Sequence, residues 1–121
     1  MPGLNVKTSL FPFRMKLRHR EPVRLEFAIS NNSDKPKIVS FELELPRQLG
    51  FDKSGLKRVD RKRLTNKLMQ GESRNFSYEI FPSKVVETGN YVFSLNVNDH
   101  FNDFSHLLET KEERVSIKIE D

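Results

Sequence analysis

Four possible metal ligands gather towards the C-terminal end of the sequence: Asp99, His100, Asp103 and His106. On a helix the last three would share one face, at a spacing that a metal site can use. Zinc needs three or four ligands that converge as a tetrahedron, and spacings of this kind are common by chance. We therefore interpret the segment as a solvated loop and predict no metal and no other cofactor. A metal-assisted hydrolase centred on His100 and His106 is the competing enzyme hypothesis.

The densest charge in the chain lies in the segment 57–63, where five of seven side chains are cationic and one is acidic. Like charges that lie close together repel one another unless an anion compensates them. The first twenty residues add five cations and no acid. We predict that this charge contacts a partner or a polyanion, through Lys57, Arg58, Arg61, Lys62, Arg63, Arg18 and Arg20. The alternative is a solvated loop whose charge is balanced by the acidic residues of 99–121.

Other catalytic arrangements are missing from the sequence. The five glycines stand singly, so no glycine-rich loop can hold phosphate, and no serine lies in a G-x-S-x-G turn. The chain has no cysteine, which excludes disulfides and thiolate chemistry. Glu42 and Glu44 lie two residues apart, and on a strand both would face solvent. The sequence therefore predicts that the chain is not an enzyme.

The elements that must position these side chains are strands. Ten phenylalanines stand against a single alanine, a balance that favours sheet over helix. Apolar and polar residues alternate over 23–29, 39–45, 76–80, 91–97 and 115–119, and over a first strand that Pro12 interrupts. The inward phase of this alternation predicts a core of Leu25, Phe27, Ile29, Phe41, Leu43, Tyr78, Ile80, Tyr91, Phe93, Leu95, Ile117 and Ile119. Tyr91 follows a glycine at the start of its strand, which predicts a tyrosine corner.

Two segments do not alternate clearly. Leu56, Val59, Leu64 and Leu68 nearly fit one face of a basic helix, but a short strand at 64–68 after a long loop over 47–62 fits better. The apolar residues of 101–108 suggest either one or two helical turns or the extension of a hairpin.

About seven short strands in 121 residues predict an all-β fold, a single immunoglobulin-like antiparallel β-sandwich with Greek-key connections. Three motifs stand out, namely a strand that ends in Asn31-Asn-Ser33, the turn Leu68-Met-Gln-Gly-Glu-Ser73 and the strand start Gly89-Asn-Tyr91. Together they resemble immunoglobulin-like modules of the CARDB kind. Gln70 stands where these modules commonly have proline. The resemblance implies the fold of those modules and, in general terms, partner binding.

Composition and length complete the prediction. Hydrophobic residues make up 36% of the chain and charged residues 31%, which is enough for one packed core and one domain over 1–121. No apolar run is long enough to span a bilayer, and the first ten residues lack the apolar stretch of a signal peptide. We predict a cytoplasmic binding module that recognises a protein partner and has no membrane partner. Weak, unspecific binding of a polyanion such as nucleic acid, through the loop 53–67, is the alternative.

Overall fold

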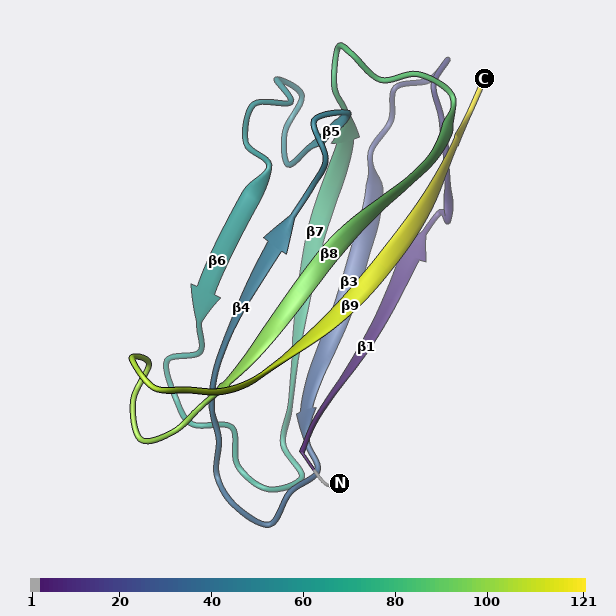
Figure 1. Cartoon of the computed structure of the whole chain (residues 1–121). Helices are drawn as coiled ribbons and strands as arrows, with labels where there is room; N and C mark the ends of the chain where they lie inside the picture. Colours follow the sequence, from purple (N-terminus) through teal and green to yellow (C-terminus); the bar gives the residue numbers. More distant parts are fainter. Residues whose placement is uncertain (1–2) are drawn as a thin grey trace.

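Nine strands form two sheets that pack face to face in the computed structural model, which describes residues 3–121 (Figure 1). The strands are β1 (Leu4–Phe11), β2 (Arg14–Lys16), β3 (Val23–Asn31), β4 (Ile38–Glu44), β5 (Leu49–Gly50), β6 (Val59–Arg63), β7 (Ser73–Pro82), β8 (Gly89–His100) and β9 (Leu107–Glu120). One sheet has the order β1-β3-β7-β5, and the other has the order β2-β9-β8-β4-β6. Over residues 3–121, no helix is long and apolar enough to cross a membrane.

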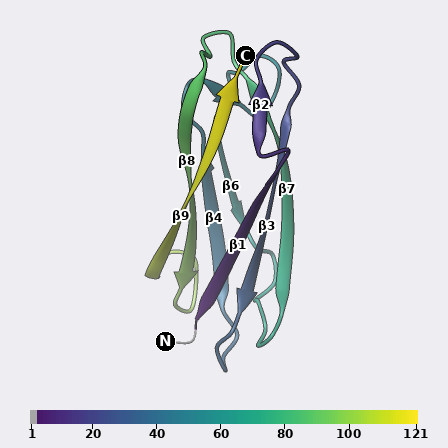
Figure 2. The same cartoon turned by 90° about the vertical axis from the view of Figure 1, so that its right-hand side faces the viewer.

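The all-β immunoglobulin-like sandwich predicted from the sequence is confirmed. Two of the nine strands are short, namely β2 and β5, which have three and two residues. The interruption at Pro12 separates two strands that belong to different sheets. β1 pairs antiparallel with β3, whereas β2 pairs parallel with β9 (Figure 2). The first strand thus changes sheets at the proline and covers an edge of both.

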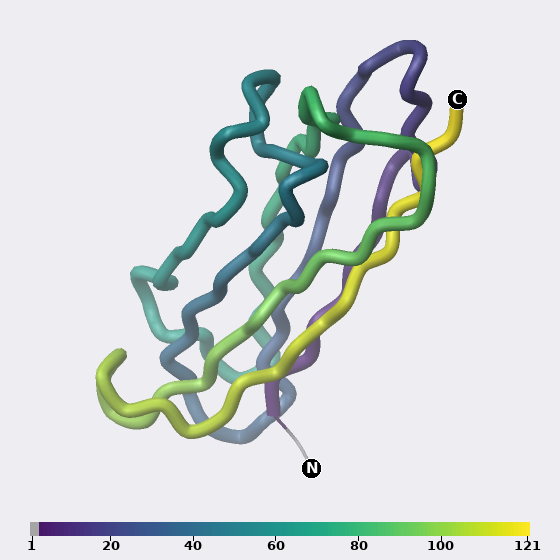
Figure 3. The backbone as a smooth tube through the Cα atoms, turned by 45° about the horizontal axis from the view of Figure 1, so that its top comes forward, coloured from purple at the N-terminus to yellow at the C-terminus, as the bar shows by residue number. Residues whose placement is uncertain are grey.

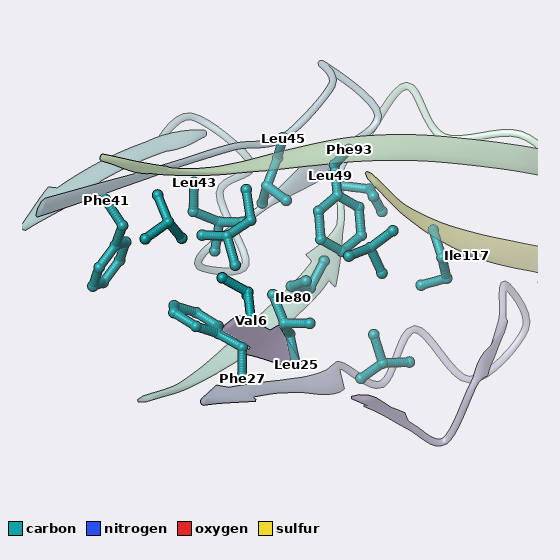
Figure 4. Packing of buried hydrophobic residues seen from close by; sticks show 14 of the residues in the cluster. Val6, Leu25, Phe27, Phe41, Leu43, Leu45, Leu49, Ile80, Phe93 and Ile117 are labelled. Atoms are coloured by element: carbon teal, nitrogen blue, oxygen red, sulfur yellow. The ribbon is translucent and has the colours of Figure 1, made fainter. Parts of the chain in front are cut away.

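The core lies between the two sheets and follows the predicted alternation (Figure 4). Ten of the twelve predicted core residues are buried, whereas Tyr78 and Tyr91 are only half-buried. Both tyrosines lie at the rim, where their hydroxyl groups reach polar partners. The Tyr91 hydroxyl donates to the Glu87 carbonyl at 2.8 Å and accepts the Glu87 N–H at 3.3 Å, which confirms the tyrosine corner.

The prediction for the segment 47–68 is wrong. The residues Val59–Arg63 form neither a helix nor part of a loop, but strand β6, which pairs antiparallel with β4. Four of its five residues are charged, so no apolar alternation marks it in the sequence. Only the pairing with β4 reveals this strand. At the second ambiguous segment the hairpin alternative is confirmed, because β8 and β9 pair up to His100 and Leu107.

The end of β3 is held by a buried asparagine. Asn31 is fully buried, and its amide group donates to the carbonyls of Lys35 at 2.7 Å and Leu68 at 2.8 Å. Its side-chain oxygen accepts the Ser33 N–H at 2.9 Å and the Ser33 hydroxyl at 2.6 Å. Every polar atom of the side chain is therefore satisfied, as burial requires. Two of the CARDB-like motifs are joined in this way at one end of the sandwich.

Candidate functional site

The seven predicted contact residues divide into two groups on different parts of the sandwich. Arg18, Arg20, Lys57 and Arg58 belong to loops that gather at one end, uppermost in Figure 1. We call the loops 17–22, 45–58 and 83–88 the loop end, and Figure 3 shows the molecule with this end tilted towards the viewer. Arg61, Lys62 and Arg63 lie instead along β6, the last strand of the five-stranded sheet. The structure therefore does not unite the basic segment in one patch.

Ser83 joins the three loops of the loop end by backbone hydrogen bonds. It is buried, its N–H donates to the Gln48 carbonyl at 2.9 Å, and its hydroxyl donates to the Arg47 carbonyl at 2.9 Å. The Arg20 guanidinium donates to the Ser83 carbonyl at 2.8 Å. Segments that are 36 and 63 residues away from Ser83 in the sequence are thus tied to one residue. The loop end is an ordered surface although it contains almost no strand.

Two glycines allow the loop 51–58 to pack directly on Ser83. Gly55 has a φ of +69°, and a Cβ there would lie 2.7 Å from the Ser83 Cβ. A Cβ on Gly50 would lie 2.6 Å from the Gly55 Cα. Between them, Asp52 accepts the Ser54 hydroxyl and the Ser54 N–H, and these hydrogen bonds lower the pKa of the Asp52 carboxyl. The backbone of this loop is therefore fixed by contacts that no larger residue permits at either glycine.

The loop end presents two aliphatic side chains to solvent among cations. Leu56 is 84% exposed and Val85 is 58% exposed, and both line an open hollow of about 410 Å³. Arg47, Arg58 and Lys84 line the same hollow. Within residues 3–121, none of these three cations forms an ion pair. Such a surface offers positive charge and apolar contact to the same ligand.

The second group, β6, has an open backbone edge. The Leu45 N–H donates to the Arg58 carbonyl at 2.8 Å, and the Leu64 N–H donates to the Val39 carbonyl at 2.9 Å. Because backbone groups alternate in direction along an antiparallel strand, residues 58, 60, 62 and 64 face β4. The N–H and C=O groups of Val59, Arg61 and Arg63 therefore face away from the sheet. They are available to another strand.

Two cations of β6 lie on the outer face of the five-stranded sheet. Arg61 Nε donates to Glu42 Oε2 at 2.6 Å, and this contact raises the pKa of the Arg61 guanidinium. The Arg63 guanidinium lies 4.9 Å from the centre of the Phe104 ring. Both charges therefore have a local partner that fixes their position along the edge.

The other two charged residues of β6 face the inside of the sandwich. Tyr78 donates a hydrogen bond of 2.6 Å to Asp60, and Lys62 Nζ lies 5.5 Å from the centre of the Tyr78 ring. Burial, followed by the hydrogen bond to Asp60, raises the pKa of the Tyr78 hydroxyl well above its usual range. A charged side chain that points inwards is a known means of preventing unwanted pairing at an edge strand.

The four possible metal ligands do not converge. His100 Nε2 lies 2.7 Å from Ser40 Oγ on the face of the sheet, whereas His106 Nδ1 lies 2.8 Å from Asp103 Oδ1 in the hairpin loop. Hydrogen bonds from Ser105 and His106 lower the pKa of Asp103 to about 2. Over the range 3–121, no group of three or more His, Cys, Asp or Glu side chains is arranged to hold a metal ion.

Asp99, the fourth possible ligand, forms an ion pair instead. It is buried, and its Oδ2 atom lies 2.8 Å from Lys37 Nζ. An ion pair removed from water must be well placed to offset the loss of hydration, and this one is also a hydrogen bond. Asp99 is therefore a structural residue that connects β8 to the segment before β4.

Sequence reasoning missed the residues that organise the loop end, namely Arg47, Leu56, Ser83, Lys84 and Val85. None of them belongs to a motif, and the two aliphatic residues are 29 positions apart. One signal was present. Gly50 and Gly55 bracket a short polar segment, and two glycines at such a spacing are consistent with a close approach of backbones.

No family model and no curated protein matches the sequence. Solved structures do match. The CARDB domain of the PF1109 protein from Pyrococcus furiosus, which was solved in complex with di-metal ions, aligns with 98% of this chain and 93% of its own, with a TM-score of 0.62 and 10% identity. The chain has the fold of a CARDB domain. At this identity the likeness concerns the CARDB-like fold alone.

A second similar structure corrects the prediction that the chain is not an enzyme. AvmM, which catalyses macrocyclization in alchivemycin A biosynthesis, aligns with 100% of this chain and 90% of its own, with a TM-score of 0.59 and 6% identity. A CARDB-like sandwich therefore occurs in a catalyst. The prediction rested on missing sequence motifs, and catalytic side chains can be brought together by a fold without forming a motif.

Proposed function

We propose that this chain is a protein-interaction module that binds an extended, acidic segment of a partner along β6. The observation that carries the proposal is the open backbone edge at Val59, Arg61 and Arg63. An extended peptide can add a strand to such an edge, with affinity from main-chain hydrogen bonds. Side chains on the edge then select the sequence of the peptide.

Charge supports an acidic partner. Three of the five residues of β6 are cationic, and only Asp60, which holds the Tyr78 hydroxyl, is acidic. Two copies of β6 would place these cations opposite one another, and like charges across a strand pair are destabilising. An acidic segment would instead meet Arg61 and Arg63 on the outer face. Charge repulsion therefore disfavours pairing between two copies of β6, whereas charge attraction favours a partner segment of opposite charge.

A short synthetic peptide tests the proposal. The probe is acetyl-Glu-Val-Glu-Thr-Glu-Val-Glu-amide, titrated into isotopically labelled protein and followed by amide NMR. We expect slower hydrogen exchange at the amides of Val59, Arg61 and Arg63, and affinity that falls as salt rises. The same peptide, N-methylated at its glutamates, keeps its charge but loses the N–H groups that would donate to the carbonyls of the edge. We expect it to bind at least tenfold more weakly.

A pair of variants separates the backbone from the charge. Arg61→Pro removes one edge-facing N–H and keeps the ladder with β4, because proline is tolerated at the open side of an edge strand. Arg61→Ala removes the same side chain and keeps the N–H. We expect the proline variant to bind more weakly than the alanine variant. Equal affinities, or protection only at residues outside β6, would rule out strand addition.

A further inference from the structure

The loop end is a second surface, separate from β6. We propose that it binds an anionic lipid surface, with its two exposed aliphatic side chains in the headgroup layer and its cations against the lipid phosphates. The aliphatic side chains are Leu56 and Val85. The cations are Arg47, Arg58 and Lys84 around the hollow, and Arg20 beside Ser83.

The loop end carries the net charge of the chain. Its three loops contain seven lysines and arginines against three acids, an excess that equals the +4 of the whole sequence. The nearby C-terminal Glu120 lies 3.8 Å from Arg14. Cations close to an anionic membrane each strengthen binding by roughly fivefold, so several together give a strong preference for anionic lipid.

The exposed aliphatic residues favour a lipid surface over a nucleic acid. Phosphates of a nucleic acid would satisfy the cations, but Leu56 and Val85 provide no flat ring on which a base can stack. In the interface of a bilayer, apolar side chains enter the acyl boundary while neighbouring cations remain at the headgroups. A leucine that is 84% exposed gains from such a transfer, because nearly its whole surface leaves water.

The surface is ordered before any ligand binds. Ser83 ties the loops 17–22, 45–58 and 83–88 together, and Gly55 packs against its Cβ atom. The two aliphatic side chains therefore already line one hollow, and binding requires no additional free energy to order a loop. An amphipathic helix would form its apolar face on the membrane, whereas this sandwich presents its face in advance.

Sedimentation of the full chain with vesicles tests the proposal. The probes are vesicles of 30% phosphatidylserine in phosphatidylcholine, and vesicles of phosphatidylcholine alone. We expect binding to the first and at least tenfold weaker binding to the second, with a steep loss as salt rises. Equal binding to both compositions, or none to either, would overturn the proposal.

Two sets of variants divide the contributions. Leu56→Ser with Val85→Ser should weaken binding to the anionic vesicles at least tenfold, while Leu108→Ser, which changes an exposed leucine on the β8–β9 hairpin, should not. Replacing Arg47, Arg58 and Lys84 by Gln should weaken binding about a hundredfold, whereas Arg61→Gln with Arg63→Gln should change it little. Circular dichroism confirms that each variant folds.

Heparin is the last arm of the test. If heparin competes with vesicles and the Leu56→Ser, Val85→Ser variant binds vesicles as well as the unchanged chain, the loop end is an unspecific polyanion site and the lipid proposal is wrong. If Arg61→Gln with Arg63→Gln abolishes vesicle binding, the responsible surface is β6. That second outcome also overturns the inference and leaves the peptide-binding proposal to be judged by its own NMR experiment.

Discussion

The loop end and β6 share one continuous basic segment, yet the fold gives its two halves different surroundings. In β6, Arg61 pairs with Glu42, Arg63 lies over the Phe104 ring and Lys62 lies over the Tyr78 ring. At the loop end, Arg58 lines a hollow with exposed aliphatic side chains and has no ion pair within the described chain. A strand fixes each side chain against its neighbours, whereas converging loops leave them free for a ligand.

The difference shows that a run of charge does not define a site. Residues 58 and 61 are three positions apart, but one faces a loop cluster and the other faces a sheet. What distinguishes them is the element to which each belongs and the segment packed beside it.

Truncation of one buried core side chain should have the largest effect. Phe93 is 2% exposed and belongs to the buried cluster between the two sheets (Figure 4). Phe93→Ala should lower the free energy of unfolding by about 3–5 kcal/mol, because it removes buried surface and leaves a cavity. Urea titration followed by circular dichroism measures this, since the chain has no tryptophan. A loss below about 1 kcal/mol would show that the ring is not part of the core.

Gly55→Ala should disturb the loop end and leave β6 intact. The new Cβ would meet the Ser83 side chain, at a residue whose positive φ disfavours any side chain. We expect a loss of about 1–3 kcal/mol, with faster amide exchange in 45–58 and 83–88 but not in 59–63. Gly71→Ala is a suitable control, because its φ is also positive but no atom lies within 4 Å. Equal effects of the two changes would show that packing on Ser83 contributes nothing.

Tyr78→Phe should act on β6 alone, through pH. Burial and Asp60 raise the pKa of Tyr78, so its neutral form is favoured in the folded state. The stability that the neutral tyrosine contributes to the folded state is fully present below the pKa of an unfolded tyrosine, about 10. It is lost as the pH rises through the higher pKa of Tyr78 in the folded state. At pH 7 the variant should be about 1 kcal/mol less stable, because the hydrogen bond to Asp60 is lost. Above pH 10 its free energy of unfolding should fall less steeply with pH than that of the unchanged chain. A parallel fall in both proteins would exclude a shifted tyrosine.

The smallest change is expected for His100 and His106, which belong to neither β6 nor the loop end. His100→Ala with His106→Ala should leave metal content unchanged and lower stability by about 1 kcal/mol, because the part-buried hydrogen bond to Ser40 and the exposed one to Asp103 are lost. Elemental analysis after dialysis against zinc measures the metal. One zinc per chain that the double variant loses would restore the metal hypothesis, since bound metal stabilises the fold directly.

The sequence by itself determined the class of fold and most of the core. Leu25, Phe27 and Ile29 alternate with polar residues, and a strand must bury one side of such a pattern. The motif at Asn31 and the sequence Gly89-Asn90 before Tyr91 specify a turn and a tyrosine corner by local geometry. They could therefore be predicted without any knowledge of packing.

Tertiary contacts determine where the basic side chains of β6 and the loop end lie and what they can contact. β6 carries no alternation and is a strand only because β4 offers it a ladder of hydrogen bonds. Leu56 and Val85 share a hollow only because Ser83 ties their loops together. Local propensity acts over a few neighbouring residues, whereas an edge or a loop cluster depends on contacts between segments far apart in the chain, and those contacts exist only once the sandwich has closed.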